Sequence, residues 1–129
     1  MKNNNTSYQM GDFLIQLKNA AMAHKKTVSV ASTKKILAIS EALKKMGYLS
    51  EVTKNKEGIT CALTYKSKSP LLMDVKLVSK PGRRIYFGIA EIEAKKSPAT
   101  LLISSPKGII SAKEAIKLRT GGEIIAEIL

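Results

Sequence analysis

The chain is organised around Ile103-Ser104-Ser105-Pro106-Lys107-Gly108-Ile109-Ile110-Ser111-Ala112-Lys113-Glu114-Ala115, which Thr120-Gly121-Gly122-Glu123 follows. The apolar run that ends at Ile103 predicts a strand, and a Pro-Lys-Gly turn is expected after the two serines. The hydroxyls of Ser104 and Ser105 and the ammonium group of Lys107 therefore lie at the end of a regular element. A surface built from such small groups can approach the backbone of another molecule closely.

A short helix is predicted to follow this turn, with Ser111 as its N-cap. Glu114 lies three residues later and completes a capping box, in which each side chain satisfies a backbone donor that the helix start leaves free. Beyond the helix, Gly121-Gly122 allows a sharp turn before a predicted apolar strand over residues 124–129. On a basic chain, the molecule that such a surface contacts is expected to be a nucleic acid.

The positive charge is spread over the whole chain. Its 129 residues hold 22 Lys and Arg against 10 Asp and Glu, a formal net charge of +12. Residues 1–65 hold 10 basic and 4 acidic residues and residues 66–129 hold 12 and 6, so that each half carries +6. This balance favours a polyanionic partner. We place nucleic acid ahead of a merely solvated surface, and an anionic membrane surface third.

Membrane and secretory classes are not expected. No apolar run approaches the roughly 20 residues that span a bilayer, and residues 1–7, expected to be a mobile polar arm, lack the apolar core of a signal peptide. The single cysteine, Cys61, cannot form an internal disulfide and is expected to be a small buried hydrophobe. These features predict a cytoplasmic protein.

The first part of the chain predicts an α/β lobe with two helices on a three-stranded sheet. Apolar residues at helical spacing indicate the helices, the first capped by Thr6 or Ser7, and β-branched alternation indicates the strands. The expected elements are a helix over 8–23, a strand over 27–30, a helix that opens at 31–33 and stops at Gly47, strands over 48–53 and 59–65 around a hairpin turn, and a further strand of this group over 73–78.

Residues 79–84 mark the expected boundary between two lobes. Pro81-Gly82 fits a type II turn, with proline fixing φ and glycine taking the positive φ, and two arginines follow it. Residues 90–96 are expected to form a short irregular or helical connection. The predicted architecture is α+β, with an N-terminal α/β lobe over residues 1–80. A mainly antiparallel β lobe with a short helix, expected to bind RNA, covers residues 81–129.

Enzyme chemistry finds little support. One histidine and one cysteine cannot make a usual metal site, and no Walker loop occurs. Ser104 and Lys107 match S-x-x-K, and residues 119–121 loosely match K-T-G. However, Pro106 lies in a predicted turn between the serine and the lysine, and the S-D-N element is missing. No catalytic residue, metal, cofactor or small-molecule substrate is therefore expected. Low aromatic content favours recognition of a structured RNA by shape and polar contacts over base-stacking platforms.

Several spaced motifs resemble one known family, the eighth protein of the bacterial small ribosomal subunit. The resemblance runs from about Tyr8 to Leu129. Residues 79–86 resemble the family's S-[KR]-P-G-x-R-[IV]-Y, residues 104–108 resemble its S-T-S-K-G, and residues 12–20 resemble its first-helix motif. Further matches are Ser32-Thr33-Lys34, Lys113-Glu114-Ala115 and Gly121-Gly122-Glu123.

The chain departs from the family pattern at several positions. Pro106 stands where the family has a serine, which removes one hydroxyl and stiffens the turn. Gln16 replaces an arginine of the first helix, Ser97-Pro98-Ala99 replaces G-L-G, and Ile128-Leu129 replaces the last aromatic residues. The chain is therefore identified as a divergent member.

The resemblance implies a primary binder of the 16S rRNA central domain at a helical junction, which supports subunit assembly and translation beside neighbouring small-subunit proteins. The alternative is a free-standing RNA-binding regulator that represses translation of its own messenger RNA. The expected RNA contacts are Lys18, Asn19, Ser32, Thr33, Lys34, Lys80, Arg83, Arg84, Ser104, Ser105, Lys107, Gly108, Gly121, Gly122 and Glu123.

Overall fold

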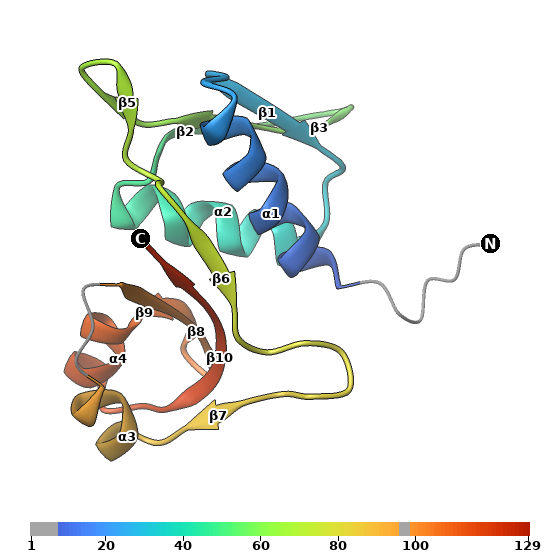
Figure 1. The fold of residues 1–129 in the computed structure, drawn as a ribbon. Helices are drawn as coiled ribbons and strands as arrows, with labels where there is room; N and C mark the ends of the chain where they lie inside the picture. The colour runs from blue at the N-terminus through green and yellow to red at the C-terminus, as the bar shows by residue number, and fades with distance from the viewer. Residues whose placement is uncertain (1–7, 96–98) are drawn as a thin grey trace.

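The computed structural model describes residues 8–95 and 99–129, and it confirms the predicted α+β fold (Figure 1). The first part packs two helices with an antiparallel sheet of strand order β1-β3-β2, and a small hairpin follows the sheet. Its elements are α1 (Gln9–Met22), β1 (Thr27–Val30), α2 (Lys34–Met46), β2 (Leu49–Asn55), β3 (Gly58–Leu63), β4 (Tyr65–Lys66) and β5 (Ser69–Pro70).

The second part is an antiparallel sheet of order β6-β10-β8-β9, in which β7 also pairs with β10. Two short helices accompany this sheet (Figure 1): the predicted short helix, and a second in the segment expected to be irregular or helical. Its elements are β6 (Val75–Leu77), β7 (Tyr86–Phe87), α3 (Ile89–Ala94), β8 (Thr100–Ser105), β9 (Gly108–Ser111), α4 (Ala112–Leu118) and β10 (Gly122–Ile128).

The two ends of α2 follow local sequence signals. The Thr33 hydroxyl accepts a hydrogen bond from the backbone N–H of Ile36 at 3.1 Å and so caps α2. Gly47 closes the same helix in the left-handed conformation, at φ 97°. In α1 the N-cap position falls on Tyr8, which makes no side-chain cap. The predicted caps Thr6 and Ser7, like the predicted arm over residues 1–7, lie outside the described residues.

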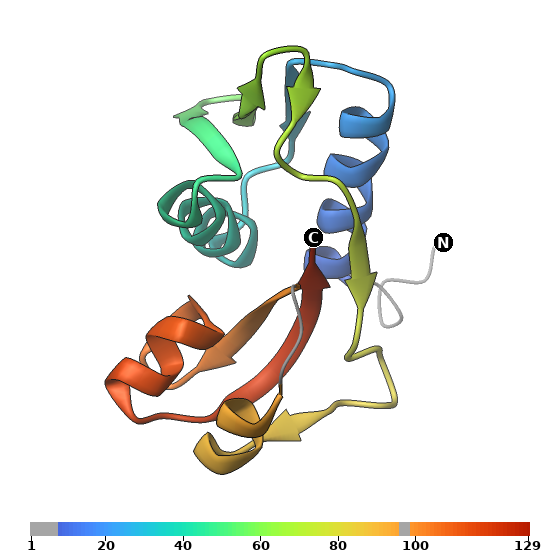
Figure 2. The same cartoon turned by 60° about the vertical axis from the view of Figure 1, so that its left-hand side comes forward.

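The prediction that residues 73–78 join the first sheet is wrong. Strand β6 pairs with β10 of the second sheet, with Val75 opposite Ile128, and the Leu129 N–H donates to the Asp74 carbonyl at 2.9 Å. Figure 2 shows these two strands side by side between the two parts. The third strand of the first sheet is instead β1, whose pattern was recognised but whose pairing was not. The domain boundary at residue 80 stays a prediction.

The strands β8 and β10 serve two hydrophobic cores, because successive side chains of a strand point to opposite faces. Leu102 packs into the large core with α1 and α2, whereas Leu101 and Ile103 pack into a smaller core with α3 and α4. On β10, Ile124 belongs to the smaller core and Ile125 to the larger one, where the register shifts between Ile124 and Ala126. The second sheet is therefore anchored to the first part by its own core side chains.

Strand β9 has no counterpart among the predicted elements, in which a helix with its N-cap at Ser111 follows the Pro-Lys-Gly turn. Gly108 to Ser111 instead pair with β8, with Ser105 opposite Gly108 and Ile103 opposite Ile110. Helix α4 begins at Ala112, directly after Ser111, as the predicted N-cap requires. The serines therefore end one strand of a hairpin, and the turn between β8 and β9 is reduced to Pro106 and Lys107.

Candidate nucleic-acid interface

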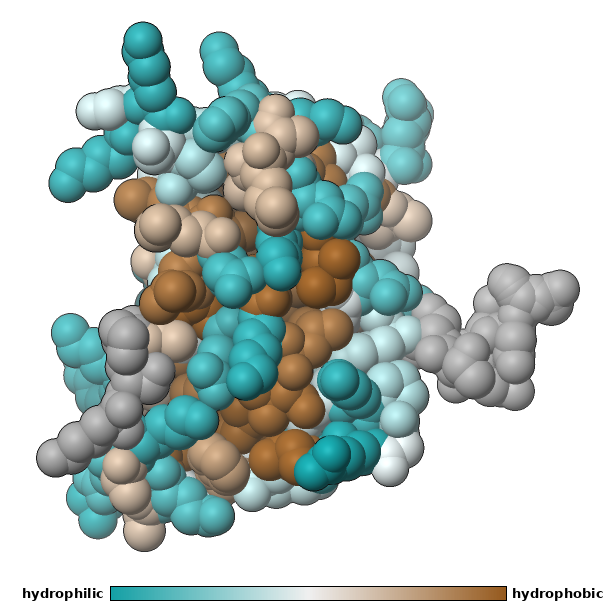
Figure 3. Space-filling view, in the orientation of Figure 1, coloured by the Kyte–Doolittle hydropathy of each residue, from teal (hydrophilic) through white to brown (hydrophobic). Residues whose placement is uncertain are grey.

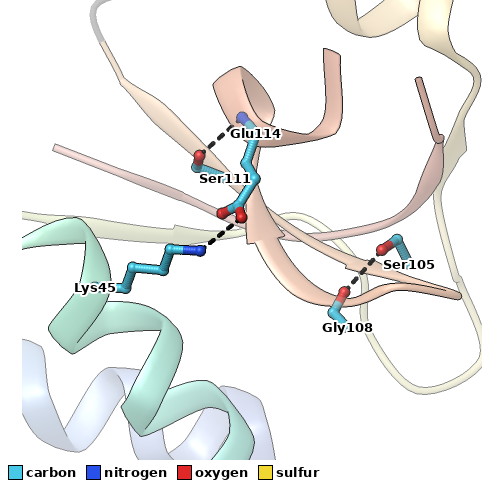
Figure 4. Close-up of polar contacts among 5 residues, drawn as sticks. All are labelled: Lys45, Ser105, Gly108, Ser111 and Glu114. Atoms are coloured by element: carbon cyan, nitrogen blue, oxygen red, sulfur yellow. Dashed lines mark hydrogen bonds and ion pairs between the residues drawn. The ribbon is translucent and has the colours of Figure 1, made fainter. Parts of the chain in front are cut away.

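The tip of the β8–β9 hairpin is held by the Ser105 side chain. Its hydroxyl donates to the Gly108 carbonyl at 2.8 Å, as Figure 4 shows, and accepts from the Lys107 backbone N–H at 3.1 Å. Gly108 has φ 115°, a conformation that disfavours residues with a Cβ. Pro106 and Lys107 are exposed beyond this lock. The tip thus presents one cation and a fixed loop to solvent.

Gly121 and Gly122 are required for close approach of backbones. A Cβ at Gly121 would collide with the Phe87 carbonyl oxygen, and a Cβ at Gly122 would collide with that of Ser104. Neither glycine has a positive φ; the left-handed residue after α4 is Arg119, at φ 56°. The predicted sharp turn at the glycine pair is therefore wrong, because the chain turns at Arg119 and the glycines let β10 pack against β7 and β8.

Glu123 links the hairpin to the Pro81-Gly82 turn. It lies opposite Ser104 in the β10–β8 pairing, and its carboxylate binds the Arg84 guanidinium at 3.0 Å. This hydrogen bond raises the pKa of Arg84. The same guanidinium lies 5.3 Å from the centre of the Tyr8 ring, whose hydroxyl pKa is raised by burial and then by Glu123. Three of the predicted contacts, Ser104, Glu123 and Arg84, therefore lie close together in the structure.

A basic cleft of about 340 Å³ lies between the starts of α1 and α2 and the Arg84 side chain. Thr33 and Lys34, both predicted contacts, line it together with Arg84. Lys35 also lines the cleft and is not among the predicted contacts, although its place beside Lys34 in the first turn of a helix is a signal in the sequence. Positive side chains there oppose the helix dipole, so that an anionic partner would relieve an unfavourable local arrangement.

The remaining predicted residues lie elsewhere. Lys18 binds the Asp74 carboxylate at 2.9 Å, and this hydrogen bond holds the pKa of Asp74 below its usual range. Asn19 lines a separate groove of about 440 Å³ between α1 and β1, and Ser32 is exposed before α2. Lys80 and Arg83 pair through their backbones, with N–H to carbonyl distances of 3.0 and 2.8 Å.

The turn between Lys80 and Arg83 agrees with the type II prediction at its diagnostic residue. Gly82 has φ 82°, which is the value that this turn requires at its third position. A Cβ at Gly82 would meet no atom of the described residues within 4 Å. Glycine is therefore favoured there by the backbone conformation and not by crowding.

The predicted capping box at α4 forms only in part. The Ser111 hydroxyl accepts from the Glu114 N–H at 3.2 Å, which confirms the N-cap. The Glu114 carboxylate instead binds the Lys45 ammonium group of α2 at 2.7 Å (Figure 4). This ion pair joins the two parts of the molecule, and a partner 69 residues away could not be read from the local motif.

Other site chemistries receive no support. Ser104 lies in a strand and Lys107 in a hairpin loop, so that the S-x-x-K match lacks the helical turn that an acyl-transfer site needs. Cys61 is buried, as predicted, and burial raises the pKa of its thiol. Within residues 8–95 and 99–129, no three His, Cys, Asp or Glu side chains are grouped to hold a metal ion. In the same ranges, no helix has the length and apolar character needed to cross a membrane.

Comparison with known proteins points to one family along almost the whole chain. The sequence model of the family described as Ribosomal protein S8 matches residues 9–129. The small ribosomal subunit protein uS8 of Roseiflexus castenholzii is 35% identical over 125 residues, which cover 92% of this chain and 95% of that protein. The proteins of the same name from Wolbachia pipientis wMel and Mycoplasmopsis synoviae are 35% and 36% identical and cover 95% and 92% of this chain, with 97% and 95% of their own lengths.

These matches agree with the motifs and the architecture described above, and they identify a family of ribosomal proteins and not of enzymes. The chain belongs to the ribosomal protein S8 family.

Proposed function

We propose that this chain is a structural component of the small ribosomal subunit and binds the central domain of 16S rRNA at a helical junction. Its relatives carry the name of a small ribosomal subunit protein, and identity extends over nearly their full lengths. Neighbouring small-subunit proteins are its other expected partners, and the cytoplasm is its expected compartment.

The ordered tip of the β8–β9 hairpin is the main structural support for an RNA contact. The Ser105 hydroxyl has a further lone pair beyond its two hydrogen bonds, and the loop around it is already ordered. A narrow, preorganised tip fits the wide and shallow minor groove of an RNA helix, where 2′-hydroxyls and base edges are displayed. The exposed Lys107 then holds a phosphate, and little conformational entropy is lost on binding.

The basic cleft of Thr33, Lys34, Lys35 and Arg84 is the second part of this interface. Its cations come from two segments that are distant in sequence, and Glu123 ties Arg84 to the base of the hairpin. RNA bound at the hairpin tip can therefore be held by the first part of the molecule as well. Contacts through phosphates fix orientation, and contacts at the hairpin tip supply selectivity.

The alternative function is a free regulator that represses its own messenger RNA with the same surface. Sedimentation of cell extracts through a sucrose gradient separates the two. A ribosomal protein is expected to migrate with small subunits and to remain there after a moderate salt wash, whereas a free regulator would stay in the light fractions. Absence from the small-subunit fraction would contradict the proposed function.

A further inference from the structure

We infer that the groove between the loop at His24 to Lys26 and the β4–β5 hairpin is a second RNA-contact surface, which takes an unpaired stretch of RNA. This inference rests on the proposed function, because it assumes that RNA is the physiological partner. It extends that function to a groove that none of the predicted contacts lines.

The groove has a volume of about 540 Å³ and combines cations with an apolar and aromatic lining. Lys26, Lys68 and His24 surround it, and Tyr65 and Leu63 form apolar parts of its lining. In Figure 3, hydrophilic side chains project from the upper edge of the molecule, where Figure 1 places β1 and the β4–β5 hairpin. Aromatic rings that stack bases beside lysines that hold phosphates are the combination with which proteins bind single-stranded nucleic acid.

The two sides of the groove are held together by hydrogen bonds. The Tyr65 hydroxyl donates to the Lys25 carbonyl at 2.7 Å, and the Leu63 N–H donates to the Lys26 carbonyl at 2.9 Å. His24 and Ser67, at the bends of the two loops, both have φ 58°. Non-glycine residues in this conformation persist where the surrounding structure holds them. Backbone hydrogen bonds therefore hold Lys26 against Leu63, and the pairing of Lys66 with Ser69 closes the turn that carries Lys68.

The charge of the groove is not neutralised within the protein. Among the described residues, neither Lys26 nor Lys68 makes an ion pair, whereas Lys18 and Lys45 each bind a carboxylate. No carboxylate of the described residues lines the groove. Two exposed lysines facing one groove repel each other and attract a polyanion. A chain of phosphates with planar bases satisfies both the cations and the apolar lining.

The experiment measures binding of the full chain to a fluorescent dodecamer of uridylate across a salt titration. The double variant Lys26→Gln/Lys68→Gln is compared with Lys44→Gln/Lys76→Gln, which removes the same amount of charge. Lys44 and Lys76 are exposed and line none of the described grooves. Since each phosphate contact with single-stranded RNA contributes about 0.7 to the slope of log K against log salt, we expect the groove variant to lose about 1.4. The control variant is expected to keep the wild-type slope.

A second pair of variants tests the aromatic wall. Tyr65→Leu is expected to weaken binding of the dodecamer about fivefold or more, because base stacking on an aromatic ring is lost. Tyr65→Phe keeps the ring and removes only the bond to the Lys25 carbonyl, so that it is expected to bind more tightly than Tyr65→Leu. Thermal melting of each variant establishes that it is folded at the assay temperature.

The outcomes separate this inference from the proposed function. Equal slopes in the two lysine variants would overturn the groove proposal. Binding of an oligoglutamate peptide is measured with the same variants. If Lys26→Gln/Lys68→Gln loses binding to this peptide but binds uridylate as the wild type does, the groove belongs to an acidic protein segment and the proposal is overturned. Selectivity of the wild type for central-domain 16S RNA is measured separately. If that selectivity is absent while the groove variant still loses slope, the proposed function fails and the groove stands.

Discussion

Replacing Gly122 by alanine tests whether close packing of backbones holds the base of the β8–β9 hairpin. A Cβ at this position would collide with the Ser104 carbonyl oxygen and would lie 3.0 Å from the Ile103 Cγ2 atom. The Ser104 carbonyl belongs to the backbone of β8, beside the pairing of Ser104 with Glu123, and cannot turn away as a flexible side chain would. The strands β8 and β10 must therefore separate locally to accommodate one methyl group.

The expected loss of stability follows from the kind of neighbour that the methyl group meets. Overpacking of a well-packed interior costs about 1–3 kcal/mol, and here the neighbour is backbone, so that relief by a change of rotamer is not available. For a chain of this length each kcal/mol lowers the melting temperature by about 4 °C. Gly122→Ala is thus expected to melt roughly 4–12 °C below the wild type.

Thermal unfolding followed by circular dichroism measures this difference. Gly88→Ala is the matched control, because a Cβ there would meet only the Glu91 Oε1 atom at 3.8 Å and the backbone has an ordinary φ of −85°. The control is expected to lose less than about 1 kcal/mol, the loss of a glycine N-cap. A Gly122→Ala variant that melts with the wild type would refute the argument from close approach.

Three further outcomes are expected. Gly82→Val should destabilise the fold by about 1–2 kcal/mol because a β-branched residue resists positive φ, and an unchanged denaturant midpoint would contradict the turn assignment. The depressed pKa of Asp74 gives stability that is present above its ordinary pKa and is lost as pH falls through the folded value, so Lys18→Met should reduce the loss of stability on acidification below about pH 4; an acid-unfolding curve identical to that of the wild type would count against this ion pair. Lys107→Ala should weaken binding to central-domain and generic RNA alike and lower the salt slope by about 1, and a slope equal to that of the wild type would show that Lys107 contacts no phosphate.

Signals that act within a few residues predicted the structure well. Helix α2 begins after Thr33 and ends at Gly47, because an N-cap needs only a hydroxyl and a C-cap only a missing Cβ at the right place. The alternating residues 27–30 likewise predicted a strand, and the Pro81-Gly82 pair predicted the positive φ at Gly82. Ser111 was correctly placed as an N-cap even though the strand before it was missed.

Pairings between distant segments could not be predicted. The pattern of β6 indicates a strand and says nothing about its partner, which is the end of the chain. Glu114 has the spacing of a capping box, yet Lys45 of α2 offers a stronger, charged partner once the two parts meet. β9 was overlooked because Ile109 and Ile110 are too few to distinguish a strand from the start of a helix.

The same distinction holds for the candidate interface. Family resemblance named Thr33, Lys34 and Arg84, but only the fold shows that they line one cleft with Lys35. The groove at Tyr65 has no sequence signal of its own, because its cations come from two unrelated loops. Whether the predicted residues contact RNA stays a prediction.

The measurement that tests the central claim most directly is selective RNA binding by the hairpin tip. The purified chain is titrated with 16S central-domain RNA and with a generic duplex of equal length, alongside Ser105→Ala and the control Ser50→Ala, whose exposed hydroxyl donates to the Ala62 carbonyl at 3.4 Å. We expect tighter binding of the central-domain RNA by the wild type and by Ser50→Ala, and a loss of about 1–3 kcal/mol of that binding in Ser105→Ala. Equal affinity of the wild type for both RNAs, or full selectivity in Ser105→Ala, would contradict recognition by this hairpin.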